Sequence, residues 1–97
     1  KTNIIMATLK FTKEGSRYVS EVEVTSDFNL HIEREQGGVI YLQTRTTPTG
    51  RFDSVKGFNI ANLDPVIDYD FTALVYPKTI RIVSEVEPTM AEITFAE

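Results

Sequence analysis

The stretch FNLHIE, residues 28–33, decides the fold, because apolar and polar residues alternate strictly along it. Alternation also occurs in residues 21–24, where Val22 and Val24 interleave with Glu21 and Glu23, and in residues 67–71. A β-strand sends successive side chains to opposite faces, so each of these stretches predicts a strand with one buried face and one solvent-exposed face. Apolar residues with the spacing of an amphipathic helix are not found. The pattern therefore predicts an all-β protein.

The composition supports the same fold class. Val, Ile and Thr together account for 30 residues, whereas Leu and Ala account for 10. Side chains branched at Cβ pack well on a pleated sheet and lose rotamer freedom in a helix. The 97 residues fit one domain, which we expect to span 1–97.

Turn residues divide the chain into seven or eight predicted strands. Gly37 and Gly38 predict a hairpin turn after the third stretch, and residues 47–54 form the longest predicted loop. Turns every 8–12 residues are typical of an antiparallel two-sheet sandwich, for which jelly-roll and immunoglobulin-like strand orders both stay open. The predicted strands are 4–11, 17–25, 28–35, 39–46, 55–60, 66–76, 79–85 and 91–96.

Two predicted strands carry apolar residues on both faces. In residues 39–46, Val39 and Tyr41 face away from Ile40 and Leu42, which indicates a central strand covered on both sides. At the start of the chain Met6 faces away from Ile5, so we also expect that end to be covered on both faces.

Charge and cysteine content exclude several classes of protein. The net charge is −4 with a pI of about 5.0, and no basic stripe is present, so we expect no nucleic-acid partner. The absence of cysteine excludes a disulfide scaffold, a thiolate zinc site and a thiol nucleophile. No apolar run approaches the roughly 20 residues that a membrane-spanning helix needs. The first residue, Lys1, leaves open a removed upstream segment, and the compartment stays open, with an extracytoplasmic, virion or cell-surface location favoured.

The candidate ligand-binding residues cluster around the longest predicted loop. They are Arg45, Arg51, Phe52 and Phe58, with Tyr41 as a further member. Aromatic rings flanked by guanidinium groups can stack on sugars or hold anions, and loops at the end of a sandwich are common recognition sites. The alternative is that Phe52 and Phe58 close the end of the core while Arg51 is solvated.

The single histidine and a group of aspartates are the other residues with chemical potential. His31 suits a general base or a metal ligand, but no serine or aspartate completes a triad in sequence, so a solvated strand residue is favoured. Asp64, Asp68 and Asp70 carry oxygens suited to calcium, yet their spacing matches no EF-hand loop. We therefore predict no catalytic residue, no metal site and no cofactor, and interpret these aspartates as the polar face of an exposed strand.

Four glutamates form an acidic stretch over two neighbouring predicted strands. If those strands pair, the carboxylates share one solvated face, and Arg17 and Arg34 partly offset their repulsion. The glutamates are Glu21, Glu23, Glu33 and Glu35.

These observations favour a non-catalytic binding or structural module whose partner is a protein, including a second copy of itself. The alternative is a carbohydrate-binding module that uses the region 51–58, with a glycan as ligand. A small hydrolase that uses Asp68 or Asp70 is the least favoured hypothesis, because no constellation of nucleophile, base and orienting group is present.

Overall fold

The computed structural model describes residues 4–56, 58 and 64–96 and forms two antiparallel sheets packed face to face. The four-stranded sheet has the order β1-β9-β4-β7, and the five-stranded sheet has the order β2-β3-β8-β5-β6. The predicted all-β two-sheet sandwich is confirmed. The strands are β1 (Ile4–Thr8), β2 (Thr12–Glu14), β3 (Arg17–Val24), β4 (Phe28–Arg34), β5 (Ile40–Arg45), β6 (Asp53–Ser54), β7 (Val66–Phe71), β8 (Lys78–Ser84) and β9 (Pro88–Ala96).

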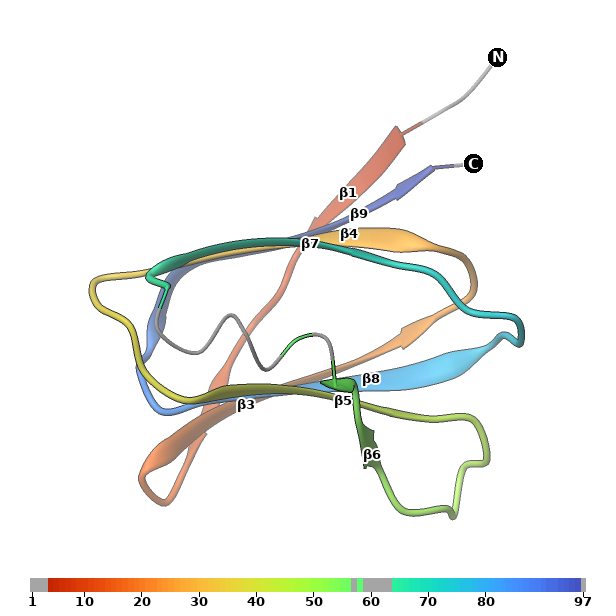
Figure 1. The fold of residues 1–97 in the computed structure, drawn as a ribbon, viewed down its shortest axis with the longest axis horizontal. Coiled ribbons are helices and arrows are strands. Elements are labelled where there is room, and N and C mark those ends of the chain that lie inside the picture. The colour runs from red at the N-terminus through yellow and green to blue at the C-terminus, as the bar shows by residue number, and fades with distance from the viewer. Residues whose placement is uncertain (1–3, 57, 59–63, 97) are drawn as a thin grey trace.

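The pairing of the strands is nested, which distinguishes a jelly roll from an immunoglobulin-like sandwich. β1 pairs with β9, β3 with β8, β4 with β7 and β5 with β6, as in one long antiparallel hairpin rolled into two layers. In the rolled arrangement β4 also pairs with β9 and β5 also pairs with β8, and β2 lies at one edge of the five-stranded sheet. The two layers are visible in Figure 1, where β1 and the end of β9 extend beyond the body of the sandwich.

The core follows the alternation seen in the sequence. Along β4 the residues are buried and half-buried in strict turn, with Leu30 and Ile32 completely inaccessible to solvent. The facing sheet contributes Ile80 and Ile82 from β8, which are equally buried. Burial of these side chains from two layers is the main stabilising contribution.

The described residues form nine strands, more than the seven or eight expected. The predicted turn over 12–16 contains β2, and the predicted loop over 47–54 contains β6. The strand predicted over 55–60 is wrong where it is described: the N–H of Phe58 donates to the carbonyl of Val55 (3.2 Å), the spacing of a 3₁₀ turn. Its remaining positions, 57, 59 and 60, lie outside the described residues.

The hairpin predicted at Gly37 and Gly38 is also wrong, because β4 and β5 belong to different sheets. Gly38 instead serves a close approach between segments: a Cβ on it would lie 2.8 Å from Cγ2 of Val86. The only positive φ among the described residues is that of Gly15 (65°), in the turn between β2 and β3.

The amino-terminal strand is less covered than expected. β1 is an edge strand, and Ile5 and Met6 are 46% and 58% exposed, so the expected cover on both faces is absent within the described chain. Within that part, no helix is long and apolar enough to cross a membrane.

Candidate functional site

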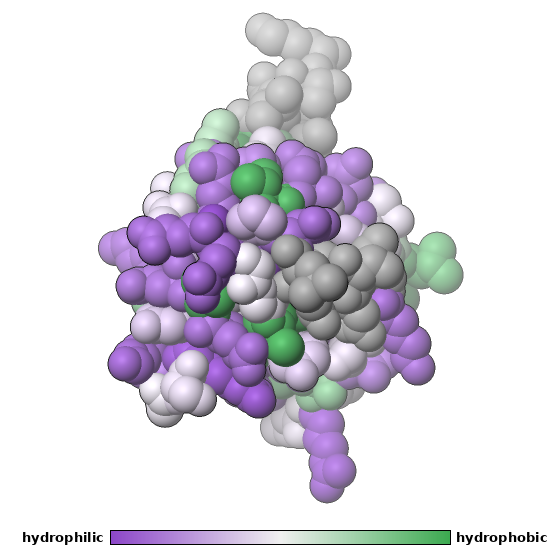
Figure 2. Space-filling model, turned by 60° about the vertical axis from the view of Figure 1, so that its left-hand side comes forward, coloured by the Kyte–Doolittle hydropathy of each residue, from purple (hydrophilic) through white to green (hydrophobic). Residues whose placement is uncertain are grey.

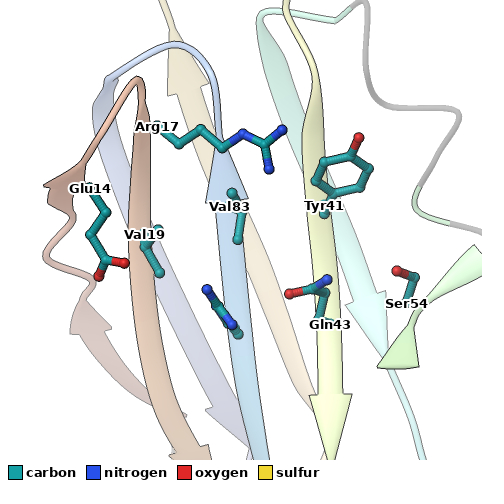
Figure 3. Close-up of a pocket in the computed structure, with 8 residues that line it drawn as sticks. Glu14, Arg17, Val19, Tyr41, Gln43, Ser54 and Val83 are labelled. Atoms are coloured by element: carbon teal, nitrogen blue, oxygen red, sulfur yellow. The ribbon is translucent and has the colours of Figure 1, made fainter. Parts of the chain in front are cut away.

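The outer face of the five-stranded sheet carries a hollow of about 410 Å³ to which all five strands contribute (Figure 3). We call it the sheet hollow. The strand register explains its composition: one row of paired residues runs Val19, Val83, Tyr41 and the next runs Glu21, Arg81, Gln43, Ser54. Its lining residues are Glu14, Arg17, Val19, Tyr41, Gln43, Ser54, Arg81 and Val83.

Two valines make the middle of the sheet hollow apolar. Val19 and Val83 point away from the core but are only 7% and 6% exposed. They are paired across β3 and β8, and Tyr41 on β5 continues the row. An apolar strip of this kind, bordered by polar side chains, suits a ligand with one apolar and one polar surface.

Three arginines contact the aromatic rings of this face. The guanidinium carbon of Arg45 lies 4.5 Å from the centre of the Phe52 ring, and that of Arg81 lies 5.4 Å from the same ring. The guanidinium carbon of Arg17 lies 6.0 Å from the centre of the Tyr41 ring. These are cation–π distances, and they place two aromatic rings and three cations on one surface.

The guanidinium groups keep unused hydrogen-bond donors. No ion pair joins Arg17, Arg45 or Arg81 to a carboxylate within the described residues, where the only ion pairs involve His31. The buried Nε atoms of Arg45 and Arg81 have no hydrogen-bond partner among the residues that the structure describes. Arg45 donates from Nη1 to the carbonyl of Gly50 (3.3 Å). A donor without an acceptor is costly, so these guanidinium groups are suited to donate hydrogen bonds to a ligand's oxygen atoms.

The structure brings together only some of the residues predicted to bind a ligand. Arg45 and Phe52 stack on the outer face, and Tyr41 lies on the same face. Phe58 is completely buried and packs edge-on against Tyr69, with ring centres 5.1 Å apart. Arg51 is exposed. Phe58 therefore belongs to the core and Arg51 to the solvated surface, as the alternative interpretation of this loop expected, whereas Phe52 lies outside the core.

Arg17, Arg81 and the two valines were missed at the sequence level. They come from β3 and β8, which are about 60 positions from each other along the chain and adjacent only after folding. One signal for them does exist: Val19 and Val83 follow Tyr18 and Ile82 directly and so break the alternation. An apolar residue at a solvent-facing position indicates a covered outer face.

The outer face of the four-stranded sheet is acidic and contains His31. Its Nδ1 lies 3.1 Å from Oδ2 of Asp68, and its Nε2 lies 2.9 Å from Oε2 of Glu33. The hydrogen bonds to Glu33 and then Asp68 raise the pKa of His31 above 6.5. The amide of Asn29 donates to Asp68, and this bond and the one from His31 lower the pKa of Asp68 below 3.8.

The aspartates on this face act as hydrogen-bond acceptors for neighbouring strands. Asp68 and Asp70 are exposed on β7, and Asn29 on β4 donates to both. Asp64 accepts a hydrogen bond from Arg34 through its backbone carbonyl rather than its carboxylate. No group of three or more metal-ligating side chains placed to hold an ion occurs in the described ranges.

The four glutamates do not share one face, because the two strands on which their shared face depended do not pair. Glu21 and Glu23 lie on β3 and Glu33 lies on β4, in different sheets. Arg34 does not offset their charges, because it is buried (4% exposed) and donates to backbone carbonyls. Burial lowers its pKa.

A second hollow, of about 420 Å³, lies at the end of β4, β7 and β9. It is lined in part by Phe28, Phe71 and Phe95. The rings of Phe28 and Phe71 stack with centres 5.0 Å apart, and these residues are only 4% and 8% exposed. Their ring surfaces are already used in packing, so the sheet hollow is the better candidate for a ligand.

The chain matches no protein-family model, no curated protein sequence and no solved structure. A functional proposal therefore depends on the geometry of the two outer faces.

Proposed function

We propose that this chain is a non-catalytic binding module that holds a carbohydrate in the sheet hollow. The observation that carries the proposal is the convergence of Tyr41 and Phe52 with three arginines on one outer face. This site differs from the region 51–58 expected from the sequence, because it lies on the sheet and excludes Phe58. A partner protein remains the broader hypothesis.

The chemistry of the sheet hollow suits a sugar. The apolar strip of Val19, Val83 and Tyr41 offers a surface for the C–H face of a pyranose ring. Gln43 and Ser54 offer amide and hydroxyl groups to its hydroxyl groups, and Arg81 offers unpaired N–H donors. Both polar and apolar partners are thus within one hollow, as in many ligand sites.

Binding rather than catalysis is supported by the position of the one histidine. His31 lies on the outer face of the other sheet, and both of its ring nitrogens contact carboxylates. The sheet hollow itself is lined by no histidine, and its one lining carboxylate, Glu14 on β2, lies at the opposite edge of the sheet from Ser54 on β6. A nucleophile without an adjacent base is poorly suited to covalent catalysis.

A glycan array tests this proposal. We expect the wild-type protein to bind a group of related glycans, and Tyr41→Ala to lose most of that signal because the ring no longer covers the apolar strip. Lys10→Ala is the control, since Lys10 is exposed and lies outside the sheet hollow. Circular dichroism confirms that each variant is folded. Absence of binding to every glycan, or full binding by Tyr41→Ala, would contradict the proposal.

Self-association through β1 is a second candidate function. β1 is an edge strand with exposed Ile5 and Met6 and no charged residue within Ile4–Thr8, so two copies can pair without opposing like charges. The face shown in Figure 2 has only small, separated hydrophobic patches, which favours an edge over a broad apolar interface. Light scattering should show a concentration-dependent dimer that Met6→Lys abolishes; a wild-type monomer at millimolar concentration would exclude it.

A further inference from the structure

We infer that the sheet hollow is specific for acidic saccharides whose carboxylates are bound by Arg17, Arg45 and Arg81. This inference rests on the proposed carbohydrate-binding function and adds the charge of the ligand.

The first observation is the local charge. The whole chain has a net charge of −4 and only ten Lys and Arg residues, yet Arg17 and Arg81 both line one hollow, and Arg45 contacts the same ring as Arg81. Two of them, Arg45 and Arg81, contact the same ring, that of Phe52. Placing like charges around one ring is unfavourable unless something compensates, and an anionic ligand does so.

The second observation is that no carboxylate of the described chain neutralises these groups. Glu21 is the strand partner of Arg81, yet the two form no ion pair. Glu14 also lines the hollow, at the β2 edge, and Figure 3 shows Arg17 extending away from it, across β8 toward Tyr41. These two carboxylates therefore lie on the β2–β3 side of the hollow, and a bound acidic ligand would lie over β8 and β5.

The third observation is the geometry of the donors. Contact with the Phe52 ring, at 4.5 Å for Arg45 and 5.4 Å for Arg81, holds two guanidinium groups beside each other on this face. The side chain of Arg81 makes no hydrogen bond within the described residues, where its buried Nε has no partner. A guanidinium fork matches the two oxygens of a carboxylate, and such charge-assisted pairs are about twice as strong as neutral hydrogen bonds.

The fourth observation is the spacing of the arginines along the sheet. Arg45 on β5 pairs with Thr79 on β8, which lies two residues before Arg81. At the other end of β8, Ser84 pairs with Tyr18, and Arg17 lies one residue further along in the same direction. At roughly 3.3 Å per residue, the three attachment points extend over about 20 Å along the strands. That length fits an oligosaccharide with repeated acidic groups better than a single sugar.

The test compares acidic glycans with neutral counterparts of the same backbone, such as oligogalacturonate and its methyl ester, or sialylated and desialylated glycans, on one array. We expect at least tenfold more binding to the acidic member of the preferred pair. Arg81→Gln should reduce that preference to nearly onefold, and Lys10→Gln should leave it unchanged. Circular dichroism of Arg81→Gln verifies that the variant is folded.

Each other outcome has a defined meaning. Equal binding to the acidic and neutral members, or binding to neutral glycans alone, overturns the acidic specificity while the carbohydrate-binding function stands. Failure to bind any glycan overturns both. Displacement of the bound acidic glycan by a hexaglutamate peptide at equal concentration also overturns the inference, because the site would then recognise negative charge rather than an acidic sugar.

Discussion

Replacing Arg34 by methionine tests whether a buried guanidinium joins one end of the sandwich. Arg34 is 4% exposed and donates to the carbonyl oxygens of Gly38 (2.8 Å) and Asp64 (2.6 Å). These bonds connect β4 to the segments that lead into β5 and β7. Methionine fills much of the same volume without donating a hydrogen bond. Ser84, the third contact, keeps its hydrogen bonds with Val86 and so loses little.

Two opposing effects set the magnitude. Each part-buried carbonyl that loses its partner costs about 1–2 kcal/mol, in the lower half of the usual range, which gives about 2–4 kcal/mol for both. Removing this buried cation, which has no ion-pair partner in the described part of the chain, offsets part of this loss because the desolvation of the charge is relieved. We expect the hydrogen bonds to dominate, with a net loss of about 2 kcal/mol. For a domain of 97 residues this corresponds to a fall of about 10–15 °C in Tm.

Urea unfolding followed by circular dichroism provides the assay. The midpoint should fall for Arg34→Met while the slope of the transition stays unchanged, since the surface exposed on unfolding is similar. Arg51→Met is the matched control, because Arg51 is exposed, and its effect should be within about 0.5 kcal/mol. An Arg34→Met protein as stable as the wild type would refute the reasoning, because desolvation would then outweigh both hydrogen bonds.

Two further predictions concern pH and backbone spacing. Protonated His31 donates to both Glu33 and Asp68, and these bonds raise its pKa. Its contribution to stability is therefore complete below pH 6.5 and is lost as pH rises through the raised pKa. The Tm of the wild type should fall over that pH window, and the Tm of His31→Gln should not. The pKa of Asp68 is lowered, so its contribution is lost in acid, below 3.8, as pH falls through that pKa. Gly38→Ala places a Cβ 2.8 Å from Val86 Cγ2 and should cost about 1–3 kcal/mol in urea unfolding, and an unchanged midpoint would show that Val86 moves aside freely.

The candidate site was foreseen in part. Arg45 and Phe52 are near neighbours in sequence, so their proximity could be expected, and they do stack. Phe58 was predicted to bind a ligand on the same grounds, as an aromatic residue near arginines, but it is buried, because the turn at Val55 directs it inward. The local sequence around Arg81 predicts only a solvent-facing charge on an alternating strand, because it gives no indication that the Phe52 ring lies beside it.

The layered β architecture follows from the amino-acid pattern alone, because strand periodicity is a local property: each residue of 28–33 is buried or half-buried according to its own position in the alternation. The tertiary structure alone decided the nested order of the strands, the separation of β3 from β4 and the burial of Arg34. It also decided which arginines share the sheet hollow. The reason is physical: these features depend on contacts between residues distant in sequence, and pairing and inter-sheet packing establish such contacts only after the chain has folded.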